Sequence, residues 1–197
     1  MQIRHTPRVF QIRNSYKLKK TVLLFVSSII FIISAFTGIF ISTWAIQSDY
    51  IIKFSGSGAE GTFQNLSGKI NFDENSFQNS LIDVSVDANT IQTGSETKNS
   101  HAKDEDWLDV KKYPKIKFKS DAFSKSGDKY LMTGTLELHG IAKKLIIPFS
   151  FLNSENTGTF SGEFTINRKD FGINGPFFGF VAGTEVKIQL KIPVKKI

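Results

Sequence analysis

The sequence predicts an all-β protein, an eight-stranded antiparallel barrel with one short helical insert, preceded by one N-terminal transmembrane helix. Three observations predict this fold class. From Trp44 onward, apolar and polar residues alternate with a period of two, which is typical of strands with one buried face. Turn residues separate several of the alternating stretches. Before them lies an uncharged apolar run, Thr21–Ile41.

The N-terminal part predicts a membrane anchor. At about 1.5 Å per residue, a helix over Thr21–Ile41 would span about 30 Å, the thickness of a bilayer core. Residues 1–20 are expected to be a cytoplasmic basic stub, 21–43 the transmembrane helix (a signal-anchor) and 44–197 the exported domain. The alternative is a cleaved signal peptide and a soluble periplasmic barrel. The orientation follows from six basic residues that precede the run: Arg4, Arg8, Arg13, Lys17, Lys19 and Lys20.

These features place the exported domain on the periplasmic side of a bacterial inner membrane. The connection after Ile41 is short, so we expect the barrel to lie at the outer face of that membrane, where a lipid could enter from the bilayer. The formal charge of +7 comes from 25 basic and 18 acidic residues. Without the six basic residues of the stub the balance is 19 to 18, so we expect no nucleic-acid partner. The absence of cysteine excludes thiolate-metal and cysteine-nucleophile chemistry.

The exported part contains eight alternating stretches, enough for an up-and-down barrel. One face of each is apolar, and the predicted inner rows are, in chain order, Ile52 and Phe54; Leu66, Gly68, Ile70 and Phe72; Ile82, Val84, Val86 and Ala88; Ile116 and Phe118; Met132, Gly134, Leu136 and Leu138; Leu145, Ile147, Phe149 and Phe151; Phe160, Gly162, Phe164 and Ile166; and Val186, Ile188, Leu190, Ile192 and Val194.

One insert, Ser95 to Val110, lacks the alternation. Ser95 is a suitable N-cap, and the stretch predicts one or two short helices, after which Pro114 restarts extended structure. An eight-stranded barrel can be filled by its own side chains or can hold one small ligand. The apolar inner rows are compatible with both.

Several motifs, taken together, resemble the YceI-like family. They run in the family's order from Trp44 to about Ile192. The matching stretches are Trp44-Ala-Ile, Ile52-Lys-Phe54, Gly61-Thr-Phe63, Leu66-Ser-Gly68, Ser100-His101, Trp107 to Pro114, Ile116 to Ser120, Thr133 to Gly140, and Asn167-Arg-Lys-Asp-Phe-Gly172.

The resemblance implies a lipocalin-like barrel, usually exported, whose characterised members bind long apolar chains such as polyisoprenoids and have no established catalytic activity. Some members are associated with membrane cytochrome b-type electron carriers. The chain departs from the family pattern before and after His101, where Lys98-Asn99 and Ala102 stand, and at Trp107-Leu108, where the family has paired phenylalanines.

The resemblance and the inner rows together give the candidate lipid-binding residues. A further aromatic stretch between Gly175 and Phe180 would either line a lipid portal or plug one end of the barrel. The candidates are Phe54, Phe72, Val84, Val86, Phe118, Leu136, Leu138, Phe149, Phe151, Phe164, Ile166, Phe177, Phe178 and Phe180.

Four polar residues are head-group candidates: Arg168, Lys111, Lys112 and His101. Arg168 could hold a phosphate through its planar fork, or pair with Asp170 or Asp109 and lock a corner of the fold. The two lysines could face a pyrophosphate or membrane phosphates, or simply form a solvated turn. His101 and His139 are not spaced as a metal pair, so hydrogen bonds to the backbone are the favoured role and no metal is expected.

The expected function is non-catalytic binding of a long-chain apolar lipid, of quinone or polyprenyl type, inside the exported barrel. The alternative is a structural or partner-docking barrel of the cell envelope without a stable ligand. No nucleophile elbow, phosphate-binding glycine loop or metalloprotease motif is present, so no enzyme is expected. No cofactor is expected besides a bound lipid. The expected partners are a membrane lipid and a membrane electron-transport protein, and the sequence leaves the oligomeric state open.

Overall fold

The computed structural model describes residues 42–56, 59–175 and 183–197. Within them the fold is all-β, and every strand pairing is antiparallel. The strands are β1 (Thr43–Ile46), β2 (Ile51–Gly56), β3 (Ala59–Thr62), β4 (Ser67–Asn71), β5 (Leu81–Asp87), β6 (Lys115–Ser126), β7 (Lys129–Leu138), β8 (Ile141–Ser154), β9 (Thr157–Asn167) and β10 (Glu185–Lys196).

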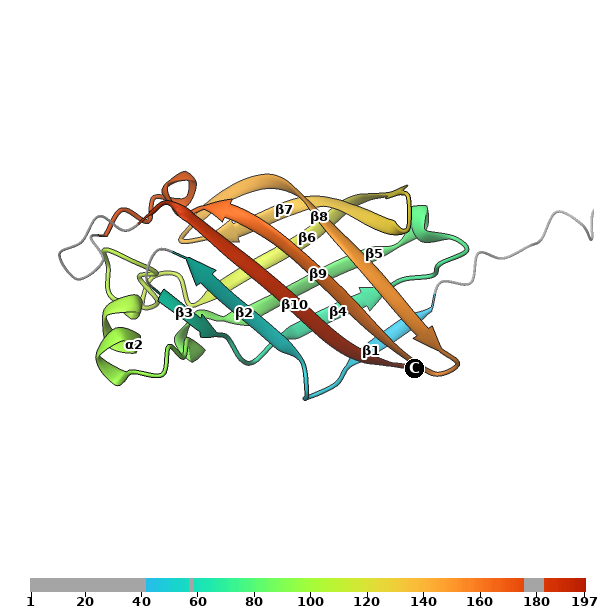
Figure 1. The fold of residues 1–197 in the computed structure, drawn as a ribbon, viewed down its shortest axis with the longest axis horizontal. Coiled ribbons are helices and arrows are strands. Elements are labelled where there is room, and N and C mark those ends of the chain that lie inside the picture. The colour runs from blue at the N-terminus through green and yellow to red at the C-terminus, as the bar shows by residue number, and fades with distance from the viewer. Residues whose placement is uncertain (1–41, 57–58, 176–182) are drawn as a thin grey trace, which may run out of the picture. The chain divides into compact units, whose positions relative to one another are not determined.

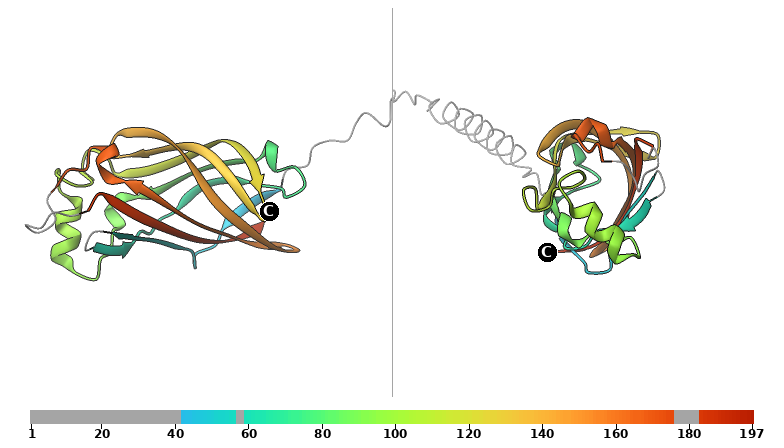
Figure 2. Two further views of the ribbon diagram at one scale, coloured as in Figure 1. Left: turned by 45° about the horizontal axis from the view of Figure 1, so that its top comes forward. Right: turned by 90° about the vertical axis from the view of Figure 1, so that its left-hand side faces the viewer.

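These strands form one closed barrel of eight positions (Figures 1 and 2). The sheet order is β1-β4-β5-β6-β7-β8-β9-β10-β2-β3, and β1 also pairs with β10. One half of β10 pairs with β1 and the other half with β2, so β1 and β2 share one position in the wall. In the same way β4 pairs with β1 and β3 pairs with β2, so β3 and β4 share the next position. The predicted eight-stranded antiparallel barrel is therefore confirmed.

The barrel has two unlike ends, as Figure 1 shows. Helix α2 (Glu96–Lys103), the 3-10 helix η3 (Arg168–Phe171) and β3 lie at one end. The C-terminus and β1 lie at the other end. There, Phe72 donates a backbone hydrogen bond to Ser42, and Ile197 donates one to Thr43. We call the first end the mouth and the second the closed end.

The helical insert forms where the sequence predicts it. The Ser95 hydroxyl caps α2 by accepting a hydrogen bond from the Lys98 amide. After the turns that follow α2, β6 begins at Lys115, directly behind Pro114. Two further short 3-10 helices, η1 (Phe77–Asn79) and η2 (Ala88–Thr90), flank β5.

No helix within residues 42–56, 59–175 and 183–197 is long and apolar enough to cross a membrane. The predicted transmembrane segment lies, as far as Ile41, outside the described residues. Thr43, which we expected at the end of that segment, is the first residue of β1.

A cluster of aromatic rings fills the closed end. Phe72 is fully buried at its centre, and its ring lies 5.1–6.2 Å from those of five neighbours. Trp44 joins the cluster by packing edge-on against Phe151, and its indole N–H donates to the Phe72 carbonyl at 2.8 Å. Edge-to-face ring pairs of this kind stabilise a core beyond the area they bury. The five neighbours of Phe72 are Phe123, Tyr130, Phe149, Phe151 and Phe160.

Candidate functional site

The mouth half of the barrel encloses a cavity of about 510 Å³. The inner row of β10 shows where this cavity begins. Val194 and Ile192 are buried, whereas Leu190, Ile188 and Val186 along the same row are only half-buried. The inner row of β9 changes in the same direction, from buried Phe160 to half-buried Phe164 and Ile166. The inward side chains therefore pack on one another at the closed end and border open space toward the mouth.

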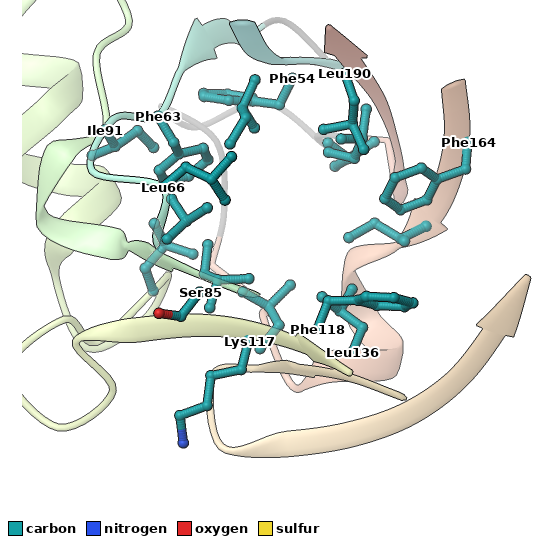
Figure 3. A pocket seen from close by; sticks show the side chains of 18 of the residues that line it. Phe54, Phe63, Leu66, Ser85, Ile91, Lys117, Phe118, Leu136, Phe164 and Leu190 are labelled. Atoms are coloured by element: carbon teal, nitrogen blue, oxygen red, sulfur yellow. The ribbon is translucent and has the colours of Figure 1, made fainter. Parts of the chain in front are cut away.

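Hydrocarbon side chains make up most of the cavity wall. Figure 3 shows Phe54, Phe118, Leu136, Phe164 and Leu190 arranged around a shared space, with their side chains on its inner side. A volume of this size lies within the roughly 300–1,000 Å³ of small-molecule sites, which are mostly apolar with a few polar groups. The arrangement can therefore hold an apolar molecule.

The structure brings nine of the fourteen candidate lipid-binding residues to this wall. Phe72 and Phe151 lie elsewhere, in the aromatic cluster of the closed end, where they pack on other rings. Phe177, Phe178 and Phe180 lie outside the described residues, so their predicted part in a portal or plug stays a prediction. The nine residues at the wall are Phe54, Val84, Val86, Phe118, Leu136, Leu138, Phe149, Phe164 and Ile166.

Segments between the strands also contribute residues to the wall that the alternation did not reveal. Ile91 follows η2, which the Asp87 carboxylate caps by accepting a hydrogen bond from the Asn89 amide. That bond holds the pKa of Asp87 below its ordinary value. Trp107 and Leu108 come from the turns after α2, where two large apolar residues inside a charged stretch were the available signal. Other such residues are Phe63, Ala102 and Ile173, whereas Leu66, just before β4, belongs to a predicted inner row.

Most polar residues of the described lining lie toward the mouth of this cavity, while Ser85 and Ser161 border it along β5 and β9. Lys98 and His101 of α2, and Asp104 and Asp106 just after it, border the opening. Farther down the wall, Lys117 counts among the bordering residues, but its side chain points away from the cavity, as Figure 3 shows, and its amine binds Glu137 at 3.0 Å. An elongated guest would thus meet hydrocarbon inside and polar groups at the opening.

Arg168 is buried at the mouth, with 6% of its surface exposed. Its guanidinium donates to the carbonyl oxygen of Ile173 at 2.6 Å and to that of Gly183 at 3.1 Å. It also lies over the Trp107 ring, 5.2 Å from the ring centre, a cation–π distance. Arg168 therefore connects three segments: the one after β9 through Ile173, the one before β10 through Gly183, and the helical insert through Trp107.

The model of the YceI-like domain matches residues 43–194, which is most of the chain. The chain belongs to the YceI-like family. The match covers every strand of the barrel, with β10 matched as far as Val194.

Two relatives of this YceI-like protein agree with the assignment. A UPF0312 protein of Pseudomonas savastanoi pv. phaseolicola is 33% identical over 154 residues, which cover 67% of this chain and 80% of that protein. A UPF0312 protein of Pseudomonas putida is 35% identical over 158 residues, covering 76% of this chain and 79% of that protein.

Two solved structures share the fold. BcnA of Burkholderia cenocepacia superposes with a TM-score of 0.72 at 24% identity, covering 76% of this chain and 99% of that one. A polyisoprenoid binding domain from Saccharophagus degradans superposes with a TM-score of 0.61 at 13% identity, covering 80% of this chain and all of that one.

The head-group candidates of this YceI-like domain fall into two groups. Arg168 and His101 border the cavity, whereas Lys111 and Lys112 are exposed residues outside the described lining. A hydrogen bond with Tyr113 raises the pKa of Lys112, and the amine lies 5.2 Å from the centre of the Tyr113 ring. The structure thus places Lys112 against a neighbouring side chain and not at the opening.

The two histidines of the barrel, His101 and His139, lie in different surroundings. His139 occupies the β7–β8 turn with a positive φ of 52°, and its Nδ1 donates to the Phe171 carbonyl at 3.0 Å, as we expected of a structural histidine. His101 lies in the last turn of α2 at the cavity mouth. Within the described part of the chain, no three histidine, aspartate or glutamate side chains are grouped as metal ligands.

Proposed function

We propose that this YceI-like barrel binds one long apolar chain, an isoprenoid-type lipid such as a quinone or polyprenyl compound, in the mouth half of its interior. The observation that carries the proposal is the change along β10 from buried Val194 to half-buried Val186, which separates a packed end from an open cavity. A barrel that served only as a scaffold would have no need for an apolar cavity of about 510 Å³ beside a well-packed core. The polyisoprenoid binding domain with the same fold gives further support.

The proposed activity is binding and not catalysis. Hydrocarbon side chains line the proposed ligand's path, and they offer burial but no group that transfers a proton or attacks a bond. At the mouth, the Arg168 guanidinium already donates to two carbonyl oxygens, which suits a role in holding the fold together. Burial of apolar surface, about 25 cal/mol per Å², would supply the binding energy.

We further propose that the barrel is exported and held at the inner membrane by residues 21–41. The support is the uncharged run of 21 residues and the six basic residues before it. A membrane lipid would then be the ligand, and a membrane electron-transport protein would be the partner if that lipid is a quinone. Sequencing the N-terminus of the mature protein tests the anchor, because a chain that starts after Ile41 would be a soluble periplasmic protein.

The experiment that tests binding is mass spectrometry of an organic extract of the purified protein. We expect about one lipid per chain in the wild type. Ile188→Trp, which places a larger ring inside the cavity, should lose that lipid. The matched control Thr165→Trp places the same ring on the exposed outer face of β9, so it should keep the lipid. A wild-type extract without lipid, together with failure to take up added prenyl alcohols, would leave the structural or docking barrel as the better reading.

A further inference from the structure

The cavity ends at a floor of large side chains well inside the barrel. Phe149, Phe160, Met132 and Ile192 line the cavity, and each of them is also buried in the core. Directly behind this floor lies Phe72, whose ring is 5.6 Å from that of Phe149 and 5.3 Å from that of Phe160. Phe72 itself is 0% exposed, so the floor is backed by tightly packed rings and not by further open space.

The depth of the cavity follows from the strands that line it. Along β10 the lining residues run from Val186 to Ile192, six residue steps, or about 20 Å along the strand. A strand tilt of about 35–45° reduces this to about 15 Å along the barrel axis. The whole of β10 has 12 residues and is about 40 Å long. Only about half of the wall therefore borders the cavity.

The volume sets a matching limit on the guest. An apolar cavity of about 150 Å³ is known to hold one benzene molecule, which has six carbon atoms. In proportion, a cavity of about 510 Å³ holds about twenty carbon atoms, or about four isoprene units. A chain much longer than this would have to displace the rings around Phe72 or leave its remainder in water outside the mouth.

We propose that the aromatic floor makes this barrel selective for chain length, with an optimum near four isoprene units. The inference rests on the proposed function and names the ligand class more closely. The hydrocarbon end contacts Phe149, Phe160 and Met132, and the polar end lies at the mouth near His101. Shorter chains leave part of the cavity empty and lose contacts, while longer chains expose apolar surface to water.

Competition from vesicles tests the proposal directly. The delipidated protein is incubated with phosphatidylcholine vesicles that contain equal amounts of farnesol, geranylgeraniol and solanesol, which have three, four and nine isoprene units. The protein is then separated, extracted and analysed by mass spectrometry. Vesicles are the reference because each prenol starts in hydrocarbon, so any selection reflects how well its chain fits the protein. We expect geranylgeraniol to be bound at least tenfold in preference to solanesol.

Two variants should move the optimum in opposite directions. Leu190→Phe adds side-chain volume just above the floor and should shift the preference to farnesol. Phe160→Leu removes part of the floor and should raise the share of bound solanesol at least threefold. The matched control is Lys191→Phe, because Lys191 follows Leu190 in β10 and is exposed on the outer face. This variant should bind the three prenols in the same proportions as the wild type. Since Phe160→Leu touches the core, Leu190→Phe provides the test that does not depend on repacking it.

The outcomes separate this proposal from the proposed function. Solanesol bound as well as geranylgeraniol by the wild type, or an unchanged profile in Leu190→Phe, would overturn the length limit while lipid binding stands. Failure of the wild type to bind any of the three prenols would overturn both.

Discussion

Phenylalanine has two different roles in this barrel, and the position of each residue along the barrel axis decides which. Phe72 lies among five aromatic neighbours at the closed end and has no exposed surface. Phe164 points inward from β9 in the same way, but it is half-buried because one side of its ring borders the cavity. Removing the Phe72 ring and removing the Phe164 ring should therefore lower the free energy of unfolding by different amounts.

We expect Phe72→Ala to lower the free energy of unfolding by about 3–5 kcal/mol, the usual cost of a lost ring plus a new void. In the delipidated protein, Phe164→Ala should cost only about 1 kcal/mol, because the ring borders space that is already open. Urea unfolding measures both values. Lys117→Ala serves as the control, since its exposed ion pair with Glu137 contributes at most about 1 kcal/mol. A loss at Phe164 as large as that at Phe72 would mean that the ring is ordinary core.

The sequence pattern predicts which residues point inward but not how far the interior is filled. Phe151 of β8 and Phe164 of β9 both occupy inner rows, yet one packs in the closed-end cluster and the other borders the cavity. The difference depends on which side chains arrive from other strands at the same depth. Alternation within a single strand carries no information on this, so Phe72 and Phe151 were indistinguishable from the nine wall residues before the structure.

At the level of elements, the mouth is held together by contacts between segments far apart in the sequence. Arg168 of η3 reaches Ile173, Gly183 and Trp107, and the Gly175 amide donates to the Asp106 carbonyl. The turn between β7 and β8 joins this group through His139 and Phe171. The insert and the β9–β10 connection therefore form one hydrogen-bonded frame at the opening.

We expect Arg168→Gln to weaken that frame, because the carbonyls of Ile173 and Gly183 would lose their charged donor. The cost should be about 1–3 kcal/mol in urea unfolding, and release of a bound prenol should become faster. Arg168→Lys should be intermediate, since an ammonium lacks the planar fork that reaches both carbonyls. Lys169→Gln, at the exposed neighbouring residue, should change neither quantity. Unchanged release kinetics in Arg168→Gln would show that this contact does not control the opening.

The eight wall positions were predictable because their apolar rows have a clear period of two. The interruptions within two of them were not. β1 and β2 are separated by residues 47–50. The Gln47 amide holds this segment in place by donating a hydrogen bond to the Pro193 carbonyl of β10. β3 and β4 are separated by residues 63–66, where Asn65 has a positive φ of 59° and the Leu66 amide donates to the Tyr50 hydroxyl. Both breaks depend on partners distant in sequence, so local pattern could not locate them.

For the molecule as a whole, the direction in which the chain enters the barrel bears on how a lipid would reach the cavity. Ser42, the first residue described, lies at the closed end, where its carbonyl accepts a hydrogen bond from the Phe72 amide. The mouth, bordered by α2 and η3, is at the opposite end (Figure 1). The short connection after Ile41 had led us to expect entry directly from the bilayer. Within the described residues, the chain enters the barrel at its packed end and not at its mouth.

This polarity predicts the effect of a longer connection if residues 21–41 are a retained anchor. A flexible insert of about twenty Gly/Ser residues after Ile41 has a mean extension of about 25 Å, enough to let the domain turn its mouth toward the bilayer. We therefore expect the insert to raise lipid loading, or to leave it unchanged if a soluble carrier delivers the lipid. Mass spectrometry of extracts from the purified long- and short-linker proteins measures the difference. The matched control is the same insert placed in the exposed β8–β9 turn at Asn156, which leaves the connection at its natural length. If the longer linker clearly lowers the loading and the control insert does not, the cavity fills from the anchoring membrane only at the natural linker length. The mouth would then not be the route of entry.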